Sequence, residues 1–374
     1  MLHRARRQRE MAATESPATV LPNAEVNRQG VSAVRITYLD SDAESSWDRY
    51  VLNHPAGTFF HQLGWKRVME RTYGYKPYYL CARRNNELTG IAPAFLISNW
   101  VTGRSLMSLP FAVYGGVCAS DTESERALIA RLEQLASELQ VGHLELRNRS
   151  ATVPEYHENS RYSTFTMPLS PDPEAIYKGL PKDIRYMIRK GEKAGLKARS
   201  GFDQLPTFYR LMTINLQRLG TPAFPRVLFE NLIREYPNQV DLTVVYAGDK
   251  AVAGGMSFFF RDWTQPYYIG SLDEAKALAA NNFLWWQLIK QGAEKGCSVF
   301  DFGRSKNDSG NFDFKKKWNP RIEPLKYQVR LFGRTSLPNN SQTNPRFERV
   351  SNVWKRMPLS LTRTIGPRVV RWFP

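Results

Sequence analysis

Two stretches of this chain repeat one pattern of strand, polar turn and strand, and their matching turn residues lie 164 positions apart. The stretches are residues 78–97 (YYLCARRNNELTGIAPAFLI) and 241–260 (DLTVVYAGDKAVAGGMSFFF), in which Asn85 corresponds to Asp249. A single strand pair is too small to bury a core of its own. The repetition therefore predicts two similar modules, each built around such a pair.

Each pair continues in the same order along the chain. A third apolar and aromatic segment follows, at 105–114 in the first module and 265–271 in the second. An amphipathic helix comes next, and in the first module its leucines are spaced 4-3-4. A short strand closes each unit, at 143–148 and 299–304. This order predicts an α/β (α+β) fold of two modules with mixed, mostly antiparallel sheets and helices on their faces.

Changes in composition divide the chain into five segments. The first residues are polar and lack apolar periodicity, and the turn-rich stretch GRTSLPNNSQTNP follows the second module. Residues 174–236 have a helical pattern that is broken at 195–201 and 220–225. We therefore expect a disordered tail, a first module, a helical linker, a second module and a basic amphipathic tail, at residues 1–30, 31–170, 171–236, 237–332 and 333–374.

The net charge of +17 is concentrated in two segments. Residues 178–199 hold eight Lys or Arg and two carboxylates, and residues 331–374 hold eight Lys or Arg and only one carboxylate, Glu348. In the first segment four cations are spaced 3-4-4, which places them on one helix face. Such a face is either simply solvated or binds anions such as a pyrophosphate-linked lipid carrier or a tRNA backbone. These four cations are Lys182, Arg185, Arg189 and Lys193.

The C-terminal segment 346–374 combines cations with apolar side chains at near-helical spacing. We expect Pro358 and Pro367 to break it into short helices. A basic amphipathic segment with aromatic anchors lies either in the interface of an anionic membrane or against the body of the protein. The sequence leaves these two alternatives open.

Several classes of function are excluded by what the sequence lacks. Three cysteines are too few for a disulfide framework or a thiolate metal site, and the five histidines have no metal-binding spacing. No apolar run reaches the length of a membrane-spanning helix, and the N-terminal residues have no apolar region typical of a secretory signal. We therefore expect a cytoplasmic protein that binds no metal, peripheral on the inner membrane if the tail is an anchor.

The order of elements resembles the GNAT acyltransferase module, and its duplication resembles the FemAB family of peptidyl and aminoacyl transferases. The similar strings cover residues 47–331 in the expected order. They include Phe59-Phe60-His61, Ser108 to Gly116, Ile188 to Leu196, Phe300 to Ser305, and Phe314-Lys315 with Trp318. More narrowly, the chain is similar to the FemAB-like proteins that accompany exosortase/PEP-CTERM exopolysaccharide loci.

The resemblance implies that an amine attacks an activated acyl carbon. In such folds two central strands diverge, and their backbone N–H groups face the acyl carbonyl. Because the backbone supplies these donors, few side chains in the sequence identify the site. The acceptor implied is an amine of an anionic lipid-linked or polysaccharide precursor of the cell envelope. The alternative is a non-catalytic scaffold that uses the same basic surfaces to bind RNA or membrane.

Asp301 and Lys315 are the candidate catalytic residues. Asp301 ends the last core strand between two phenylalanines, where a carboxylate can accept the amine's proton or orient the ammonium; the alternative is a structural carboxylate that caps the backbone beside Gly303. Lys315 follows Phe314, and the resemblance places a lysine that contacts the anionic substrate or the reactive carbonyl here. The other candidates for substrate binding are Arg304, Lys306, Tyr114, Gly115, Gly116 and Tyr268.

Tyr114, Gly115 and Gly116 predict a tight turn with exposed backbone amides. At the start of the second module's main helix, coenzyme A-dependent GNAT proteins carry a glycine-rich turn, whereas residues 274–282 (EAKALAANN) contain no glycine. The departure weakens coenzyme A as the donor and favours an aminoacyl-tRNA. The choice between aminoacyl-tRNA and acyl-CoA stays open, and no tightly bound cofactor is expected.

Overall fold

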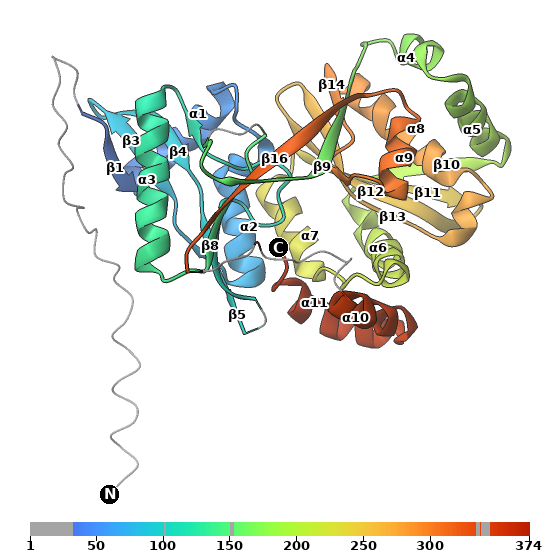
Figure 1. Ribbon diagram of the computed structural model, residues 1–374. Helices are drawn as coiled ribbons and strands as arrows, with labels where there is room; N and C mark the ends of the chain where they lie inside the picture. The colour runs from blue at the N-terminus through green and yellow to red at the C-terminus, as the bar shows by residue number, and fades with distance from the viewer. Residues whose placement is uncertain (1–32, 101, 150–152, 334–336, 338–344) are drawn as a thin grey trace, which may run out of the picture.

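The computed structural model describes residues 33–374 apart from 101, 150–152, 334–336 and 338–344 (Figure 1). The expected disordered tail at 1–30, and most of the turn-rich stretch after the second module, lie outside the described residues. Two α/β modules make up the body, and two C-terminal helices lie along its lower edge in Figure 1.

The first module has one strand, two helices, a set of antiparallel strands, a long helix and a last strand. The opening elements are β1 (Arg35–Tyr38), α1 (Ser41–Asn53), the 3₁₀ turn η1 (Phe59–His61) and α2 (Leu63–Tyr73). The remaining elements are β2 (Lys76–Pro77), β3 (Leu80–Arg84), β4 (Glu87–Ala92), β5 (Phe95–Asn99), β6 (Gly103–Met107), β7 (Cys118–Ala119), α3 (Thr122–Glu138) and β8 (His143–Leu146).

The second module repeats this order. Helices α4 (Pro173–Gly179) and α5 (Lys182–Lys193) precede it. Its elements are β10 (Leu196–Ser200), η2 (Phe202–Gln204), α6 (Leu205–Leu219), α7 (Arg226–Glu235), β11 (Val240–Ala247), β12 (Lys250–Phe260), β13 (Trp263–Ser271), η3 (Asp273–Lys276), α8 (Ala280–Glu294), β14 (Val299–Asp301), β15 (Ser305–Lys306) and α9 (Gly310–Lys316).

The segment 171–236 is therefore not the purely helical linker that we expected. Residues 196–200, read as a break between helices, form β10, which pairs antiparallel with β11 from Leu196↔Ala247 to Ser200↔Thr243. Helices α6 and α7 contact the strands of the second module. The repeat unit thus begins with β10 rather than at residue 237.

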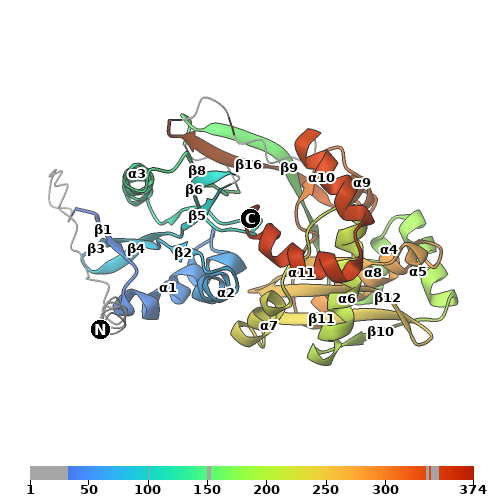
Figure 2. The same ribbon diagram turned by 90° about the horizontal axis from the view of Figure 1, so that it is seen from below.

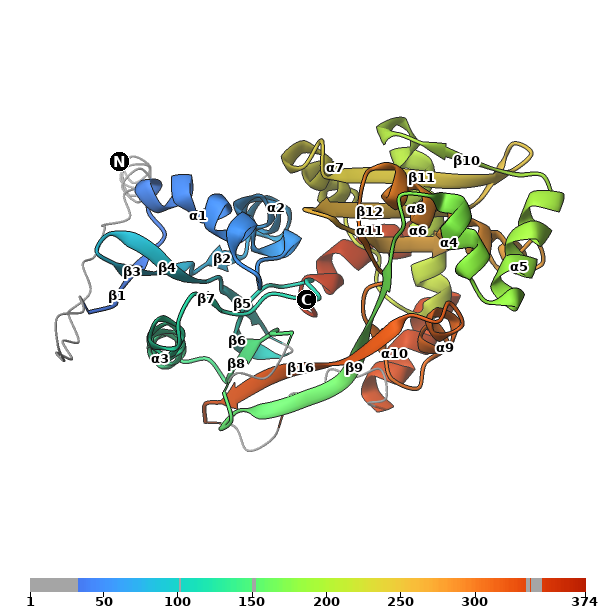
Figure 3. The ribbon, with the colours of Figure 1, turned by 90° about the horizontal axis from the view of Figure 1, so that it is seen from above.

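Two long strands that the sequence analysis did not predict join the modules. These are β9 (His157–Pro168) and β16 (Arg321–Leu331), which pair antiparallel from Arg321↔Thr166 to Val329↔His157. At one end β9 pairs with β14 of the second module, and at the other end β16 pairs with β8 of the first. One sheet, in the order β10-β11-β12-β13-β14-β9-β16-β8-β6-β5-β2, therefore runs through both modules (Figure 3). The expected boundaries at 170 and 332 assign each of these strands to a single module, whereas both strands connect the two.

The local sequence explains the strand pairs and the helix starts. Asn85 and Asn86 have φ of 51° and 67°, the left-handed conformation that a two-residue hairpin turn between β3 and β4 requires. Asp40 and Asp121 cap α1 and α3 by accepting N–H groups of the first turn. A Cβ on Gly270 would lie 2.7 Å from the Met212 backbone, so this glycine lets α6 pack closely on β13.

A shared aromatic core lies between the modules. Phe59 of η1 stacks on Phe258 of β12 with ring centroids 4.4 Å apart, and Tyr236 packs on the same ring of Phe59. Phe60 and Trp65 of the first module also contact Phe258. Because these rings come from both halves, the modules are packed into one body rather than tethered.

The C-terminal residues form α10 (Pro345–Arg356) and α11 (Leu359–Val370), both of which pack on α6 (Figure 2). Pro358 separates them, as expected. The expected break at Pro367 is wrong, because α11 continues through it to Val370. Pro367 lies in the last turn, where the missing N–H removes only one hydrogen bond.

Packing against the body accounts for one face of the tail. Trp354, Thr362 and Val370 are buried, Arg371 donates to the Tyr73 carbonyl, and Tyr75 donates to the Arg371 carbonyl. Of the two alternatives left open, this face fits packing on the body. None of the described helices has the length and apolar character needed to cross a bilayer.

Candidate active site

The two central strands of the second module separate where β13 begins and β14 ends. β13 and β14 pair in parallel only at Trp263↔Val299 and Thr264↔Phe300. Beyond this point β14 turns to β9, where Asp301 pairs with Thr166, while β13 stays beside β12. The β12–β13 register also shifts by one residue, so Tyr267 has no opposite residue on β12. Within the described residues, the edge of β13 after Thr264 has no strand partner.

Asp301 lies at the point where these strands separate and is 1% exposed. Its Oδ2 accepts hydrogen bonds from the Tyr114 hydroxyl at 2.8 Å and the Gln265 amide at 2.9 Å. Its Oδ1 accepts the Gly303 N–H at 2.7 Å and the Thr164 hydroxyl at 3.4 Å. Burial raises its pKa, although the bonds from Tyr114 and Gly303 act in the opposite direction.

The carboxylate is therefore fully paired and closed off from solvent. The backbone cap beside Gly303, which the sequence analysis left as the alternative, is present. As the structure stands, an incoming amine has no access to this carboxylate until the Tyr114 side chain or Gln265 moves away.

Residues 108–116 of the first module form a loop, here called the Tyr114 loop, that covers these strand ends. Tyr267 of β13 donates to the Phe111 carbonyl, and Tyr327 donates to the Val113 carbonyl at 2.7 Å. Phe111 has φ of 59°, a strained conformation for a bulky residue, and its ring packs on Tyr73. The contacts of the loop with both modules hold this strain in place.

The expected turn of exposed amides at Gly115 and Gly116 is wrong. Both residues are buried, and the Gly115 N–H donates to the Arg147 carbonyl at 2.9 Å. A Cβ on Gly116 would lie 1.4 Å from the Asn148 side-chain oxygen. These glycines are required because neighbouring atoms approach closely, not because the backbone must be open to a ligand.

Lys315 lies at the end of α9 and is 8% exposed. Its Nζ donates to the carbonyls of Gly303 and Arg304, at 3.0 Å each. Burial lowers its pKa to about 7, with a smaller contribution from Arg304, while the charge of Asp301 opposes the shift. Near neutral pH this amine can therefore both carry and release a proton.

Arg304 is half-buried beside this group. It donates to the Tyr327 hydroxyl at 3.0 Å, and its guanidinium lies over the Tyr162 ring, 4.8 Å from the centroid. Burial acts to lower the pKa of Arg304, but the neighbouring tyrosines together raise it above its ordinary value, so Arg304 stays charged. Lys306, in contrast, is exposed on β15.

The basic stripe on α5 forms as predicted but lies elsewhere. Lys182, Arg189 and Lys193 are exposed and Arg185 is half-buried, while Ile184 and Ile188 are buried on the opposite face. Helix α5 packs on α8 and β10 at the outer edge of the second module (Figure 1). No hydrogen bond or ion pair described here joins this stripe to Asp301 or Lys315.

Tyr268 also lies apart from Asp301. It is buried against Phe224 and Phe229, and its hydroxyl has no hydrogen-bond partner among the described residues. Its neighbour Tyr267 points to the Tyr114 loop instead. Within the strand expected to line the acyl site, the structure thus brings Tyr267 toward the Asp301 group.

The start of α8 does not form the usual coenzyme A cradle. The helix begins after Ala279, which adopts φ of 57° where a glycine would be unstrained. Ala275, Ala279 and Ala280 are buried, so the first turn presents little open backbone to a pyrophosphate. The backbone at this helix start is therefore less open to a pyrophosphate than a glycine-rich turn would be.

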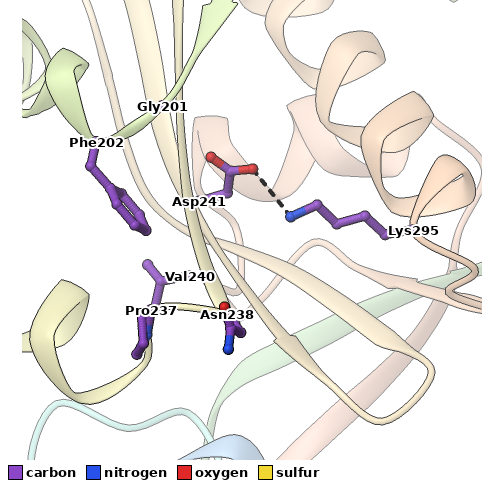
Figure 4. Close-up of a pocket in the computed structure, with 7 residues that line it drawn as sticks. All are labelled: Gly201, Phe202, Pro237, Asn238, Val240, Asp241 and Lys295. Atoms are coloured by element: carbon purple, nitrogen blue, oxygen red, sulfur yellow. Dashed lines mark hydrogen bonds and ion pairs between the residues drawn. The ribbon is translucent and has the colours of Figure 1, made fainter.

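Two surface hollows among the described residues both lie away from the separated strands. One, of about 340 Å³, is lined by residues of the η2 and β11 region and by Lys295, which pairs with Asp241 at 3.2 Å (Figure 4). The other lies on α10 and the turn after it. Among the described residues no group of His, Cys, Asp or Glu could hold a metal ion, and His61 hydrogen-bonds to Thr58 and Gly116 instead.

Sequence reasoning missed Gln265 and Thr164, which complete the partners of Asp301. Gln265 was detectable in principle, because it is a lone amide within an aromatic strand. Thr164 was not, because it lies on β9, whose serines and threonines give little apolar periodicity.

Comparisons with known proteins agree with this architecture. Residues 180–316 match the model of a family described as an acetyltransferase (GNAT) domain. No curated protein matches the chain by sequence.

Among solved structures, FemX is similar with a TM-score of 0.62 and 14% identity over 80% of this chain and 97% of its own. The C-terminal domain of a putative lysylphosphatidylglycerol synthetase from Agrobacterium fabrum has a TM-score of 0.52 and 13% identity over 77% and 92%. A tandem GNAT protein from the clavulanic acid biosynthesis pathway has a TM-score of 0.51 and 12% identity over 81% and 100%. The predicted fold is thus confirmed: the chain consists of two tandem GNAT-like modules with mixed, mostly antiparallel sheets.

Proposed function

We propose that this chain is an acyl or aminoacyl transferase that moves an activated acyl group onto an amine of a cell-envelope or exopolysaccharide precursor. The separation of β13 from β14 is the observation that carries the proposal. It opens a row of backbone groups on β13 beside the carboxyl end of β14, within the residues that match the GNAT domain model. Backbone N–H groups in such a row can stabilise a tetrahedral oxyanion.

In the proposed step the amine nitrogen attacks the acyl carbon. A C–N bond forms, the C–O bond of an aminoacyl ester or the C–S bond of a thioester breaks, and the amine's proton passes to the leaving oxygen or sulfur. Lys315 is our candidate to hold or relay that proton, because burial brings its pKa to about 7. It must first leave its two carbonyl partners.

Asp301 is better explained as a positioning residue. Its carboxylate accepts the Gly303 N–H, and the Gly303 carbonyl in turn accepts a hydrogen bond from the Lys315 amine. Arg304 and Lys306 are our candidates for contact with an anionic acceptor, and the α5 stripe is the candidate for a phosphate backbone.

The buried start of α8 favours an aminoacyl-tRNA donor over acyl-CoA. The similar lysylphosphatidylglycerol synthetase domain, whose name joins an aminoacyl group to an anionic lipid, supports an aminoacyl donor and an anionic lipid-linked acceptor. The amine of the acceptor rests on the sequence resemblance, because phosphatidylglycerol carries hydroxyl groups and no amine. We propose that the protein encounters such a precursor at the inner face of the cytoplasmic membrane. On the sequence resemblance alone, we also propose a role in an exosortase/PEP-CTERM exopolysaccharide system.

The second candidate is a non-catalytic scaffold. It is favoured by one observation, the closure of the site: Asp301 and Lys315 are both buried, and the Tyr114 hydroxyl occupies the Asp301 carboxylate. A catalytic protein must open this loop, whereas a scaffold need not.

A transfer assay separates the two candidates. The protein is incubated with ¹⁴C-labelled aminoacyl-tRNAs or acetyl-CoA and with amine-bearing glycan precursors, and products are treated with mild base, which cleaves esters but spares amides. We expect a base-stable labelled product with one donor class, reduced about 100-fold in Lys315→Met. Lys316→Met, its exposed neighbour, is the matched control. No amide from any donor, with wild-type protein folded, would favour the scaffold.

Substitutions of Asp301 test its positioning role. In Asp301→Asn one oxygen remains for the Gly303 N–H, and Tyr114 and Gln265 can turn to accept, so urea unfolding should show a loss of about 1 kcal/mol or less. Asp301→Ala leaves buried donors unpaired and should lose about 3 kcal/mol. The transfer rate of Asp301→Asn should stay within about tenfold of wild type. A fully stable but inactive Asp301→Asn protein would instead make this carboxylate the proton acceptor.

Lys315 should also make stability depend on pH. Its folded pKa of about 7 lies below the unfolded value, so between these values only the unfolded chain binds the proton and stability rises with pH. The wild-type minus Lys315→Met difference in unfolding free energy should therefore increase by up to about 1.4 kcal/mol per unit between pH 7.5 and 9.5. Urea unfolding at several pH values measures it, and a flat difference would show that Lys315 is charged when folded.

A further inference from the structure

Helix α11 has an outer face that the body does not cover. Leu361 and Ile365 are 47% and 36% exposed. Arg368 is three positions further on, which places these three side chains along one stripe of the helix, and Trp372 follows directly after the helix ends at Val370. The buried positions of the helix, 362, 366 and 370, follow a different stripe against α6 and the α6–α7 connection. The tail therefore has a second face, directed away from the body, on which exposed apolar side chains lie beside a cation.

The stripe continues onto the first module. The Trp372 ring contacts the Trp100 ring with centroids 5.7 Å apart, and the Asn99 amide donates to the Trp372 carbonyl at 3.5 Å. Trp100, between β5 and β6, is 83% exposed. In Figure 1 the tip of β5, α11 and α10 share the lower edge of the molecule, which Figure 2 views from below.

Helix α10 adds apolar surface and positive charge to the same edge. Val353 is 62% exposed, and a shallow hollow of about 660 Å³ is lined by Val353, Arg356, Met357 and their neighbours. Residues 351–374 contain five Lys or Arg and no Asp or Glu. Lys355, Arg356 and Arg368 are exposed and form no ion pair with another described residue.

We infer that this tail face docks the protein on an anionic phospholipid surface. The tail face is defined by Trp100, Val353, Leu361, Ile365 and Trp372 with the cations Lys355, Arg356 and Arg368. Cations drawn to lipid phosphates hold the face at the surface, and the aliphatic and indole side chains leave water by entering the interface. A nucleic acid would pair with the cations but would leave the aliphatic side chains exposed, so the composition favours lipid.

The docking and the packing use different sides of the tail. Trp354, Thr362 and Val370 face the body, and Gly366 lies 2.7 Å, measured from an added Cβ, from the Ala223 backbone. Deleting residues 346–374 would therefore uncover the body as well as remove the docking face. Point substitutions on the outer stripe are the sharper test.

The experiment is sedimentation of the full chain with sucrose-loaded vesicles. Wild-type protein should pellet with vesicles of phosphatidylcholine containing 30% phosphatidylglycerol and at least tenfold less with phosphatidylcholine alone. The double variant Leu361→Gln/Ile365→Gln should reduce the bound fraction at least fivefold. A matched double variant, Leu52→Gln/Val227→Gln, removes two exposed aliphatic side chains of other helices and should bind like wild type.

Two results would overturn the inference. One is equal binding of wild type and Leu361→Gln/Ile365→Gln to the anionic vesicles, or no binding by either. The other is binding to a single-stranded RNA probe that survives Leu361→Gln/Ile365→Gln but is lost in Lys355→Gln/Arg356→Gln/Arg368→Gln, together with absent vesicle binding. As an independent readout, brominated phosphatidylglycerol should quench tryptophan fluorescence less in Trp100→Phe than in wild type, and equal quenching would contradict docking through this face.

Discussion

The antiparallel pairing of β9 with β16 is the constraint on which the candidate site depends. Each strand follows one module in the chain and pairs with the sheet of the other at its far end. The modules are thereby fixed relative to each other, and the Phe59–Phe258 contact packs the space between them. In this arrangement the loop of the first module reaches Asp301 in the second.

The site that results holds its charged groups out of water. Asp301 is stabilised by four hydrogen-bond donors, and Lys315 by two carbonyls, instead of by direct pairing with each other. Burial shifts both pKa values toward the neutral forms. A closed group of this kind suits a protein whose loop opens for substrate, and Phe111 keeps its positive φ in the closed arrangement.

The repeated unit could be predicted from the sequence because its signals are local, whereas the pairing of distant segments could not. The hairpins at Asn85 and Asp249 and the leucine stripe of α3 are short-range signals, and they were correctly assigned. The β9–β16 pair joins residues more than 150 positions apart, and no local pattern indicates which distant strand each one pairs with. Within β16 the alternation of Leu325, Tyr327 and Val329 with polar residues is typical of a strand, whereas the serines and threonines of β9 give no such signal. Tyr114 and Asp301 lie 187 positions apart, so their hydrogen bond has no local signal. A Gly-Gly pair in a sequence does not indicate whether the glycines expose backbone amides or make room for a neighbouring side chain, as Gly116 does for Asn148.

Hydrogen exchange along β13 is the measurement that tests the central claim most directly. If the donor's acyl group lies between β13 and β14, the donor that supports transfer should slow exchange in residues 265–271 and speed it in residues 108–116 as the loop opens. The matched non-reactive donor class should leave both segments unchanged. Protection confined to other elements, or unchanged exchange in β13 with a donor that is turned over, would contradict the account.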